Sequence, residues 1–545
     1  MIYLYTLPGV AFNAPQLSVP LIKGYLQENN IKSKQIDLSI NFFEKCVNSH
    51  YIKTNLKKYY KSLPKKDKNI VEGIDKSIFY LKDKKINTQR IIKANEALLK
   101  YLDIFGNCYD ISWDRKGLRP YTSIKTIDSV IKYAFDKKNR IFDSVFELDP
   151  DASSDDIYYL SVQYPFQLAY AIRFSKIIKN CNSKAKIILG GDYITHIIKN
   201  AAELIEKCNY IDAIVFFGEH KYLQNLIEYY FNKHDENIPN TYIRKNNRVI
   251  CNKIEHCNSF DKSKYVPCFD DLNLEKYVSN LKLIPLTLNY GCYHSKCKFC
   301  SRYFFYNGYS NYDLDKIFYL IKKEYENNAI EAIYFIDECV PPPILIKLAN
   351  YLIDNNINIK WMVETRIDSR LEDKKIAELL YYSGCREISF GIESYNKRIL
   401  KDMDKRIDLH SAKKIMKNFF KSGISVSATF MIGYPTENIF NILRTLSFIK
   451  NFKYIDTFGL GIFNYMRNSV LVNKSNLDES ADLNLIYRKY NDNYDLYEEI
   501  INKFNSLGKI IKFSKIRSKI LYRSEYMYLD REVYSLNYKK AGGKK

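Results

Sequence analysis

Three cysteines lie close together in the stretch GCYHSKCKFC, which covers residues 291–300. These are Cys292, Cys297 and Cys300, whereas the other nine of the twelve cysteines are scattered and mostly expected to be small buried hydrophobic residues. Several thiolates on one short loop are good ligands for a soft metal ion or an iron–sulfur cluster. This loop is therefore the candidate site of chemistry.

The number of available ligands separates two kinds of metal site. A closed structural zinc site needs four ligands, and the nearest further donor, His294, is too close to Cys292 in the chain to bind the same ion comfortably. No second CxxC pair lies nearby. Three cysteines without a fourth favour a four-iron cluster with one open iron, and a structural zinc loop is the alternative.

The elements around the loop predict where it lies in the fold. Six strand-like segments alternate with helical patterns over residues 284–475, and such alternation predicts a partial or full parallel barrel. The segments are LIPLTLNY, AIYFID, IKWMVE, REISFGI, SVSATFMIG and TFGLGIF. The cysteine loop follows the first of them at its carboxyl end, where barrel enzymes place their active sites.

The rest of the chain divides into three further regions. Strand and helix patterns alternate in residues 1–240 and predict a doubly wound parallel sheet, interrupted at about 45–145 by a lysine- and tyrosine-rich stretch with helical spacing. Residues 241–283 are polar and irregular and predict a linker. Residues 476–545 predict a helical C-terminal extension.

Length and composition bound the class of protein. A chain of 545 residues is expected to form two or three domains. The net charge of +22 could indicate a nucleic-acid partner, but the lysines are spread along the chain, so nucleic acid is not the expected partner. The first residues predict a strand and not a signal peptide, and no segment reaches the roughly 18 apolar residues that span a bilayer. We expect a cytoplasmic protein.

A strand, three cysteines ending in C-x-Phe299-Cys300 and a following βα barrel resemble the radical S-adenosylmethionine (SAM) enzymes. The spacing here is CxxxxCxxC, one residue longer than the common CxxxCxxC. The resemblance implies that Cys292, Cys297 and Cys300 hold a [4Fe–4S] cluster whose open iron chelates SAM. It also implies that the reduced cluster cleaves SAM to a 5′-deoxyadenosyl radical.

Four further segments resemble the SAM-binding strands of that superfamily: FIDEC, VETRID, GCREISFGIES and SATFMIGYPTEN. The implied contacts are Glu338 or its neighbour Asp337 for the amino group, Arg366 for the carboxylate, Glu393 and Ser394 for the ribose and methionine, and Gly433 for the adenine. Ordinary alternatives are a solvated turn at the acidic pair, a surface ion pair at Arg366 and helix capping by Thr436. Thr436 stands where the familiar form has glycine, which leaves the role of Glu437 open.

The first region resembles cobalamin-binding domains, which carry the marks DxHxxG, SxL and GG. Ser161 and the pair Gly190-Gly191 match two of these marks, whereas Gln163 replaces the leucine and DxHxxG is missing. The resemblance implies cobalamin bound without a histidine ligand, or a scaffold that has lost the cofactor. A glycine pair at a strand end favours cobalamin, and a plain tight turn is the alternative.

The resemblance thus implies an α/β chain: an N-terminal Rossmann-like cobalamin-binding domain with a helical insert, a (βα)6-type partial TIM barrel with the radical SAM core, and a helical extension. We expect a radical SAM enzyme that methylates an unactivated carbon through cobalamin. Its partners would be a small-molecule or peptide substrate and an external electron donor such as flavodoxin or ferredoxin. The alternatives are a rearrangement or cyclisation enzyme with a non-binding relic domain, and a basic nucleic-acid-binding protein with a zinc loop.

Overall fold

A computed structural model gives the structure of the chain in two compact units. The N-terminal unit comprises Met1–Asn280 with Asp478–Leu485, and the C-terminal unit comprises Leu281–Leu477 with Ile486–Lys545. The residues described are 1–10, 12–109, 111–114, 117–120, 125–146, 155–217, 220–232, 236–246, 248–255, 265–301, 309–474, 483, 486–487 and 494–507. Within these ranges no helix is both long and apolar enough to cross a membrane.

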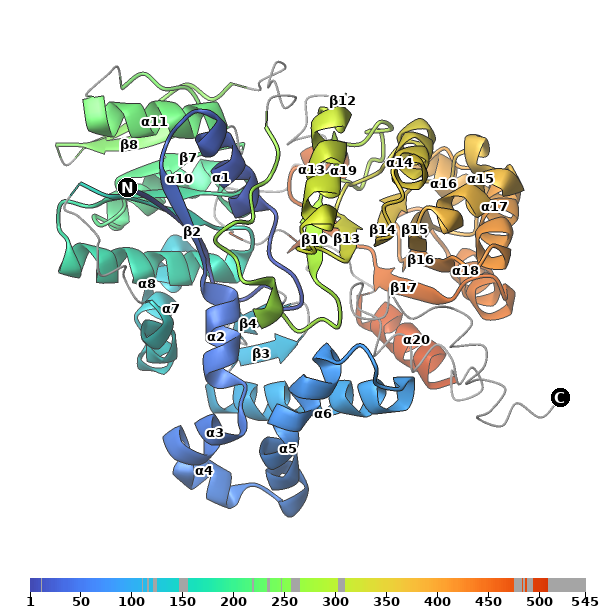
Figure 1. Ribbon diagram of the computed structural model, residues 1–545, viewed down its shortest axis with the longest axis horizontal. Coiled ribbons are helices and arrows are strands. Elements are labelled where there is room, and N and C mark those ends of the chain that lie inside the picture. Colours follow the sequence, from blue (N-terminus) through green and yellow to red (C-terminus); the bar gives the residue numbers. More distant parts are fainter. Residues whose placement is uncertain are drawn as a thin grey trace. The chain divides into compact units, whose positions relative to one another are not determined.

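The N-terminal unit, coloured blue to green in Figure 1, is built on a seven-stranded sheet of order β2-β1-β5-β6-β7-β8-β9. Its strands are β1 Ile2–Thr6, β2 Ser33–Asp37, β5 Ile157–Ser161, β6 Lys186–Gly190, β7 Ala213–Val215, β8 Thr241–Lys245 and β9 Arg248–Cys251. The first five strands in this order are parallel. The winding reverses between β1 and β5, and ligands of open parallel sheets bind beyond the carboxyl ends of the strands at such a reversal.

Continuous apolar runs explain the centre of this sheet. β1 (IYLYT) and β5 (IYYLS) are buried along their whole length, as expected of parallel strands that are covered on both faces. The helices that follow the strands of this unit are α1 Ser18–Glu28, α8 Pro165–Cys181, α9 Asp192–His196, α10 Ala201–Lys207 and α11 His220–Asn232.

The expectation of a linker over residues 241–283 is wrong in its first part. Residues 241–245 and 248–251 form β8 and β9, which extend the sheet in antiparallel fashion from β7. Thr241 and Ile243 are buried while their neighbours are half-buried or exposed, so the strand follows a period of two under a polar composition. Asn246 turns the hairpin with φ 47°, a left-handed conformation that asparagine tolerates.

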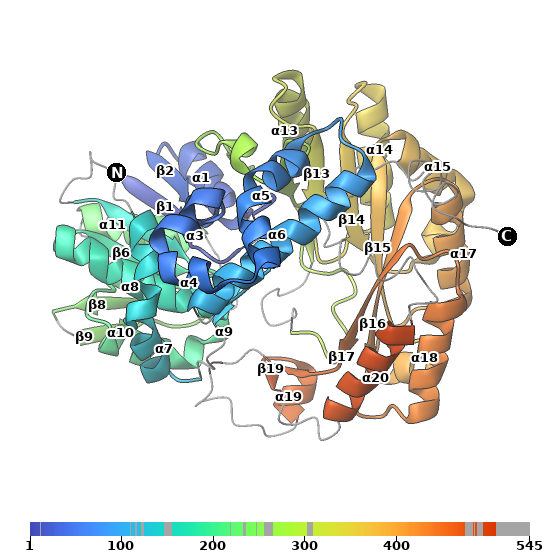
Figure 2. The ribbon, with the colours of Figure 1, turned by 90° about the horizontal axis from the view of Figure 1, so that it is seen from below.

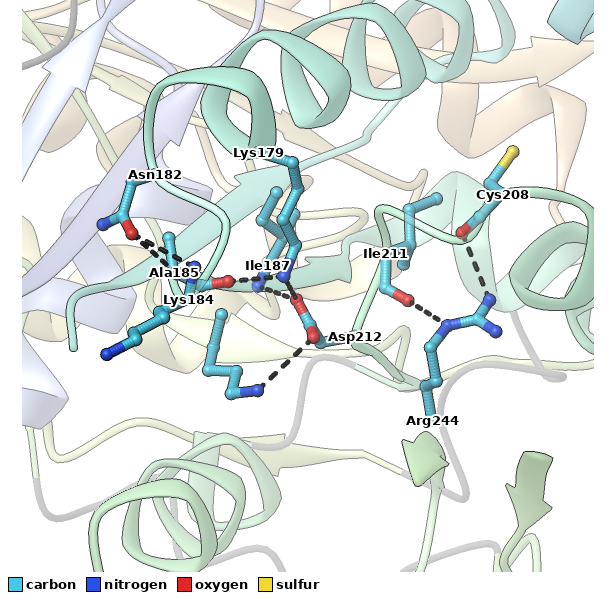
Figure 3. Close-up of polar contacts among 10 residues, drawn as sticks. Lys179, Asn182, Lys184, Ala185, Ile187, Cys208, Ile211, Asp212 and Arg244 are labelled. Carbon is cyan, nitrogen blue, oxygen red and sulfur yellow. Dashed lines mark hydrogen bonds and ion pairs between the residues drawn. The ribbon is translucent and has the colours of Figure 1, made fainter. Parts of the chain in front are cut away.

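A polar network fastens the amino ends of β6 and β7 (Figure 3). The Asp212 carboxylate accepts from the Ile187 N–H at 2.8 Å and pairs with the Lys179 ammonium at 2.8 Å. The Arg244 guanidinium on β8 donates to the carbonyl oxygens of Ile211 and Cys208 at 3.1 and 3.2 Å. These contacts lie at the amino edge of the sheet. Ligands of open parallel sheets bind at the opposite, carboxyl edge.

Residues 38–145 are mainly helical, with a short hairpin (Figure 2). The elements are α2 Leu38–Cys46, α3 Ser49–Asn55, α4 Lys57–Ser62, α5 Lys65–Lys82, α6 Thr88–Tyr109, β3 Ile111–Asp114, β4 Gly117–Pro120, α7 Ile127–Ala134 and the 3-10 helix Lys137–Val145. The Tyr101 hydroxyl on α6 donates to the carbonyl oxygens of Cys46 and Asn48 at 2.7 and 2.9 Å. This contact closes the helices over the end of α2.

The C-terminal unit contains a six-stranded parallel sheet whose strands follow chain order, β10-β13-β14-β15-β16-β17. These strands are β10 Leu283–Leu286, β13 Ala332–Phe335, β14 Lys360–Thr365, β15 Cys385–Glu393, β16 Ser425–Ile432 and β17 Thr457–Ile462. All six coincide with segments predicted from the sequence, and chain order is the strand order of a βα barrel wall. Two short strands, β11 Asn289–Tyr290 and β12 Ser310–Asn311, pair beside β10.

The helices between these strands are α13 Leu314–Glu326, α14 Pro342–Asp354, α15 Lys374–Tyr382, α16 Lys397–Asp402, α17 Leu409–Lys421 and α18 Ile439–Asn451. Most begin at an aspartate or asparagine N-cap, such as Asp313 before α13 and Asp373 before α15. These side chains accept from backbone N–H groups of the first turn, which stabilises helix starts. The helices thus begin at fixed points after each strand.

Much of the expected helical extension over 476–545 lies outside the described residues. After β18 Tyr465–Met466 and α19 Val470–Lys474, the described parts are Leu483, β19 Ile486–Tyr487 and α20 Tyr494–Leu507. Leu483 belongs to the N-terminal unit, where its carbonyl oxygen accepts from the Tyr193 hydroxyl at 2.8 Å. α20 packs in the C-terminal unit against a cluster that includes Ile432 and Leu446.

Candidate functional site

Asp337 fixes the start of the cysteine loop. Its carboxylate, 4% exposed, accepts from the N–H groups of Leu288 at 2.9 Å and Asn289 at 2.7 Å and from the Thr287 hydroxyl at 3.0 Å. Burial raises the pKa of this carboxyl to about 7, against the opposing effect of these bonds. Asp337 thus joins the segment after β10 to the end of β13, its neighbour in the sheet.

Asp337 and Glu338 therefore differ in their surroundings. Asp337 is buried and its carboxylate accepts hydrogen bonds from the segment that leads into the loop, whereas Glu338 is exposed. Of the two carboxylates considered for the amino group of SAM, Glu338 is the one that the fold leaves at the surface. Its contact with SAM stays a prediction.

The cysteine loop itself begins at Gly291, with φ 79°, directly after β11. Cys292, Cys297 and Cys300 are all partly exposed. Across the described ranges, no three or more His, Cys, Asp or Glu side chains are already arranged around a common metal position. The structure thus places the three thiols on one loop at the carboxyl end of β10, and binding a cluster would require them to converge.

Cys339 is a fourth thiol next to this loop, and sequence reasoning missed it among the scattered cysteines. It is 3% exposed and lies two residues after Asp337. Interaction with the Cys339 thiol, together with backbone N–H groups and the Lys405 charge, lowers the pKa of Cys292 to about 5 against the effect of burial. Its place in the sequence could have identified it, because Cys339 follows the carboxyl end of β13, the strand beside β10.

A short segment that begins at the last residue of α16, residues 402–406, contacts the cysteine loop at two points. His294 Nε2 donates to the carbonyl oxygen of Asp404 at 2.6 Å, and the Lys298 N–H donates to that of Met403 at 3.0 Å. Since a carbonyl oxygen only accepts, His294 carries its proton on Nε2. The imidazole therefore helps to position the cysteine loop.

Arg366, at the end of β14, holds the same segment. Its guanidinium, in a residue 9% exposed, donates from Nη2 to the carbonyl oxygens of Lys405 at 2.6 Å and Arg406 at 3.0 Å. The predicted role for Arg366 was to bind the SAM carboxylate. The structure instead gives it two backbone acceptors in the 402–406 segment, so it is a positioning residue in this conformation.

Glu393 and Ser394 lie at the end of β15 in different environments. Glu393 has φ 67°, which is unusual for a residue other than glycine or asparagine, and its carboxylate pairs with the Lys405 ammonium at 3.1 Å. Ser394 is fully buried, with its hydroxyl 3.4 Å from that of Thr445 on α18. The structure brings Glu393 to Lys405 and places Ser394 in the packing of the following helix.

Gly433 follows β16 with φ 83°, a conformation that glycine adopts without strain. Its N–H donates to the Glu437 carboxylate at 2.7 Å, and burial raises the pKa of Glu437 to about 7. A Cβ atom at Gly433 would lie 2.5 Å from the ring of Tyr497 on α20. The surface predicted for adenine is thus covered by an aromatic ring, which sequence reasoning could not anticipate.

In the N-terminal unit, the residues predicted to bind cobalamin make contacts with other residues of the same unit. The Ser161 hydroxyl accepts from the Gln163 amide at 2.8 Å and lies 3.2 Å from that of Ser18. A Cβ atom would lie 2.3 Å from the Tyr159 hydroxyl at Gly190 and 2.4 Å from the Val162 carbonyl oxygen at Gly191. Close packing within the unit therefore accounts for both glycines without a ligand.

Comparison with known sequences identifies the C-terminal unit. Residues 286–449 match the family described as the Radical SAM superfamily. The chain is 23% identical over 288 residues to an uncharacterised methyltransferase of Pyrococcus horikoshii, covering 52% of this chain and 61% of that protein. It is 23% identical over 293 residues to the anaerobic magnesium-protoporphyrin IX monomethyl ester cyclase of Rubrivivax gelatinosus, covering 52% of each. The chain spans about half to three fifths of these relatives.

Two solved structures have a similar fold. One is the cobalamin-dependent SAM radical enzyme OxsB with aqua-cobalamin and SAM bound, with a TM-score of 0.56 and 14% identity over 89% of this chain and 63% of that one. The other is the radical SAM methyltransferase TsrM from Kitasatospora setae with cobalamin and a [4Fe–4S] cluster bound, with a TM-score of 0.52 and 11% identity over 86% and 76% of the two chains. The parallel strands, the loop after the first of them and the sequence match agree: residues 286–449 are a radical SAM domain.

Proposed function

We propose that this chain is a radical SAM enzyme that methylates an unactivated carbon with the help of cobalamin. The observation that carries the first part is the cysteine loop at the carboxyl end of β10, within the radical SAM domain. The second part is supported by the fold shared with OxsB and TsrM and by a relative named as a methyltransferase.

The donor set fits a cluster better than zinc. Cys292, Cys297 and Cys300 supply three thiols on one loop, and the Nε2 atom of His294 is engaged by the Asp404 carbonyl oxygen. Cys339 is a buried free cysteine whose thiol influences the pKa of Cys292, which makes it a neighbour of the ligand set. Three thiolates leave one iron of a four-iron cluster open. A reduced cluster would supply the electron that cleaves SAM to a 5′-deoxyadenosyl radical.

The protein residues would bind SAM and keep the loop in place. Glu338 is exposed at the end of β13, where it could accept from the SAM amino group. Glu393, at the end of β15, has a left-handed backbone and pairs with Lys405. Gly433 follows the next strand, where the Tyr497 ring would have to move for the adenine to bind. Asp337 and Arg366 act through other residues, by fixing the start of the cysteine loop and the 402–406 segment. The electron would come from a donor such as flavodoxin or ferredoxin.

For cobalamin the support is the sheet order, not individual contacts. The carboxyl ends of β1 and β5, where the winding reverses, are the edge at which an open parallel sheet accepts a ligand. Ser161, Gly190 and Gly191 already make close contacts within the unit, so in this conformation none of them is available to contact cobalamin. Bound cobalamin would supply the methyl transfer.

The test is SAM cleavage by the reconstituted protein under a strong reductant. Wild type should release 5′-deoxyadenosine, and Cys292→Ala, Cys297→Ala and Cys300→Ala should each abolish its release. Cys181→Ala, at an exposed cysteine of α8 in the N-terminal unit, is the matched control and should cleave SAM like wild type. Retained cleavage in any variant of the loop would contradict the assignment of its three ligands.

A second candidate is radical cyclisation or rearrangement without methyl transfer. It is favoured by the similarity to the anaerobic cyclase of Rubrivivax gelatinosus and by the internal use of the predicted cobalamin residues. The mass of the product separates the two reactions, because methylation adds about 14 daltons and rearrangement adds none; in both, the cofactor carries the chemistry that the protein positions.

A further inference from the structure

Lys405 places a positive charge inside the radical SAM domain. Its side chain is 12% exposed and its ammonium pairs at 3.1 Å with Glu393, whose side chain is also 12% exposed. Lys405 lies in the 402–406 segment, between α16 and α17. Lys405 belongs to no motif in the sequence, and it cannot be distinguished there from the other basic residues, because the chain has 84 lysine and arginine residues.

The ammonium lies next to the cysteine loop. It is 6.0 Å from the centre of the Phe299 ring, which stands between Cys297 and Cys300 in the sequence. The loop is held to the same segment by the His294 imidazole and the Lys298 N–H group.

Several contacts keep the ammonium in place. Arg366 holds the Lys405 carbonyl oxygen, and the side chain is confined from the other side by β15. A Cβ atom added at Gly391 would lie 2.8 Å from the Lys405 Nζ and 2.7 Å from the Glu393 carboxylate. Glycine at this position accommodates the ion pair as it stands, because a side chain there would displace the ends of both charged groups.

Packing alone does not explain a buried ion pair. Removing two charges from water costs free energy that their attraction often fails to recover, and apolar residues of similar size commonly stabilise a protein as well or better. A reason other than stability is therefore needed. A fixed positive charge beside thiolates favours the more negative state of whatever they hold, because charges in a low-dielectric interior interact over several ångströms.

We propose that the Lys405 ammonium is the fixed countercharge of the cysteine loop and raises the reduction potential of a cluster held by Cys292, Cys297 and Cys300. This inference rests on the proposed function, since it requires the cluster. Glu393 acts in the opposite direction, because its carboxylate partly neutralises the ammonium. The step affected adds one electron to the cluster from an external donor and breaks no bond.

The test is a redox titration of the reconstituted full chain without SAM, followed by the electron paramagnetic resonance signal of the reduced cluster. Lys405→Met should lower the midpoint potential by at least about 59 mV, which corresponds to a tenfold change in the one-electron reduction equilibrium constant. Lys405→Arg keeps the charge and should stay near wild type. Lys401→Met, at an exposed lysine of α16, is the matched control and should not shift the potential.

A second variant covers the case in which Lys405→Met fails to assemble a cluster. Glu393→Gln removes the compensating carboxylate, keeps the size of the side chain, and should raise the midpoint potential. If either assembled variant has the wild-type potential, the inference is overturned while the proposed function stands. If wild type itself assembles no cluster, the proposed function fails as well, so the two failures are distinguishable.

Discussion

Replacing Arg366 by methionine tests whether this residue acts on the protein backbone or on SAM. The guanidinium donates two hydrogen bonds to the carbonyl oxygens of Lys405 and Arg406 in a nearly buried site. Hydrogen bonds from a charged donor contribute about 1.5–3 kcal/mol each, and some of this is recovered when water or the methionine side chain occupies the site. We therefore expect Arg366→Met to lower the free energy of unfolding by about 3 kcal/mol.

Thermal unfolding of the cluster-free chain without SAM measures this loss. For a unit of about 200 residues, 3 kcal/mol corresponds to a fall in Tm of about 6–12 °C. Arg366→Lys, which keeps one donor to the carbonyls, should lose about half as much. Arg370→Met is the matched control: Arg370 is exposed and pairs with Asp368, so its loss should cost about 1 kcal/mol or less.

The outcome that would refute this reasoning is equally clear. If Arg366→Met unfolds at the wild-type temperature but binds SAM much more weakly, its guanidinium serves the ligand and the two backbone contacts contribute nothing. If Arg366→Met lowers both the stability and the affinity for SAM, titration calorimetry of Arg366→Lys with SAM separates the two roles. For a positioning residue, this variant should lose stability before it loses affinity for SAM.

Further predictions concern Asp337 and Gly433. Burial raises the folded-state pKa of Asp337 to about 7, above its value in the unfolded chain, so its contribution to stability is full at a pH below about 4 and is lost as the pH rises through about 7. Asp337→Asn should therefore flatten the fall in unfolding free energy over this range in urea titrations, and parallel curves for the two proteins would contradict the assignment. Gly433→Ala should lower Tm because its φ of 83° and the Tyr497 ring both oppose a Cβ atom. Tyr497→Ala in the same chain should restore part of the loss, and no restoration would mean that the contact is unimportant.

The sequence predicted the strands of the C-terminal unit well because each is an apolar run separated by a helix-length segment. The cysteine loop could be placed at a strand end for the same reason. β8 was missed because its composition is largely polar, and only the alternation of buried Thr241 and Ile243 marks it as a strand. β9 was missed because it has only four residues, none of them buried. Local pattern thus located the site but not every element.

Contacts between residues far apart in the chain could not be predicted. Nothing in FIDEC indicates that Asp337 turns inward to the loop while Glu338 stays exposed, since this depends on the register of β13 against β10. The approach of Lys405 to Glu393 depends on how the segment after α16 returns to the sheet. Arg366 was correctly placed at a strand end, but its acceptors are backbone oxygens that carry no sequence signal.

The most direct measurement is the metal content of the full chain after anaerobic purification, reconstitution with iron, sulfide and hydroxocobalamin, and desalting. The proposed function predicts about four irons and one cobalt per chain. Iron without cobalt would leave the radical SAM chemistry in place and favour cyclisation or rearrangement over methylation. A chain that retains no iron would contradict the central claim that Cys292, Cys297 and Cys300 hold a cluster.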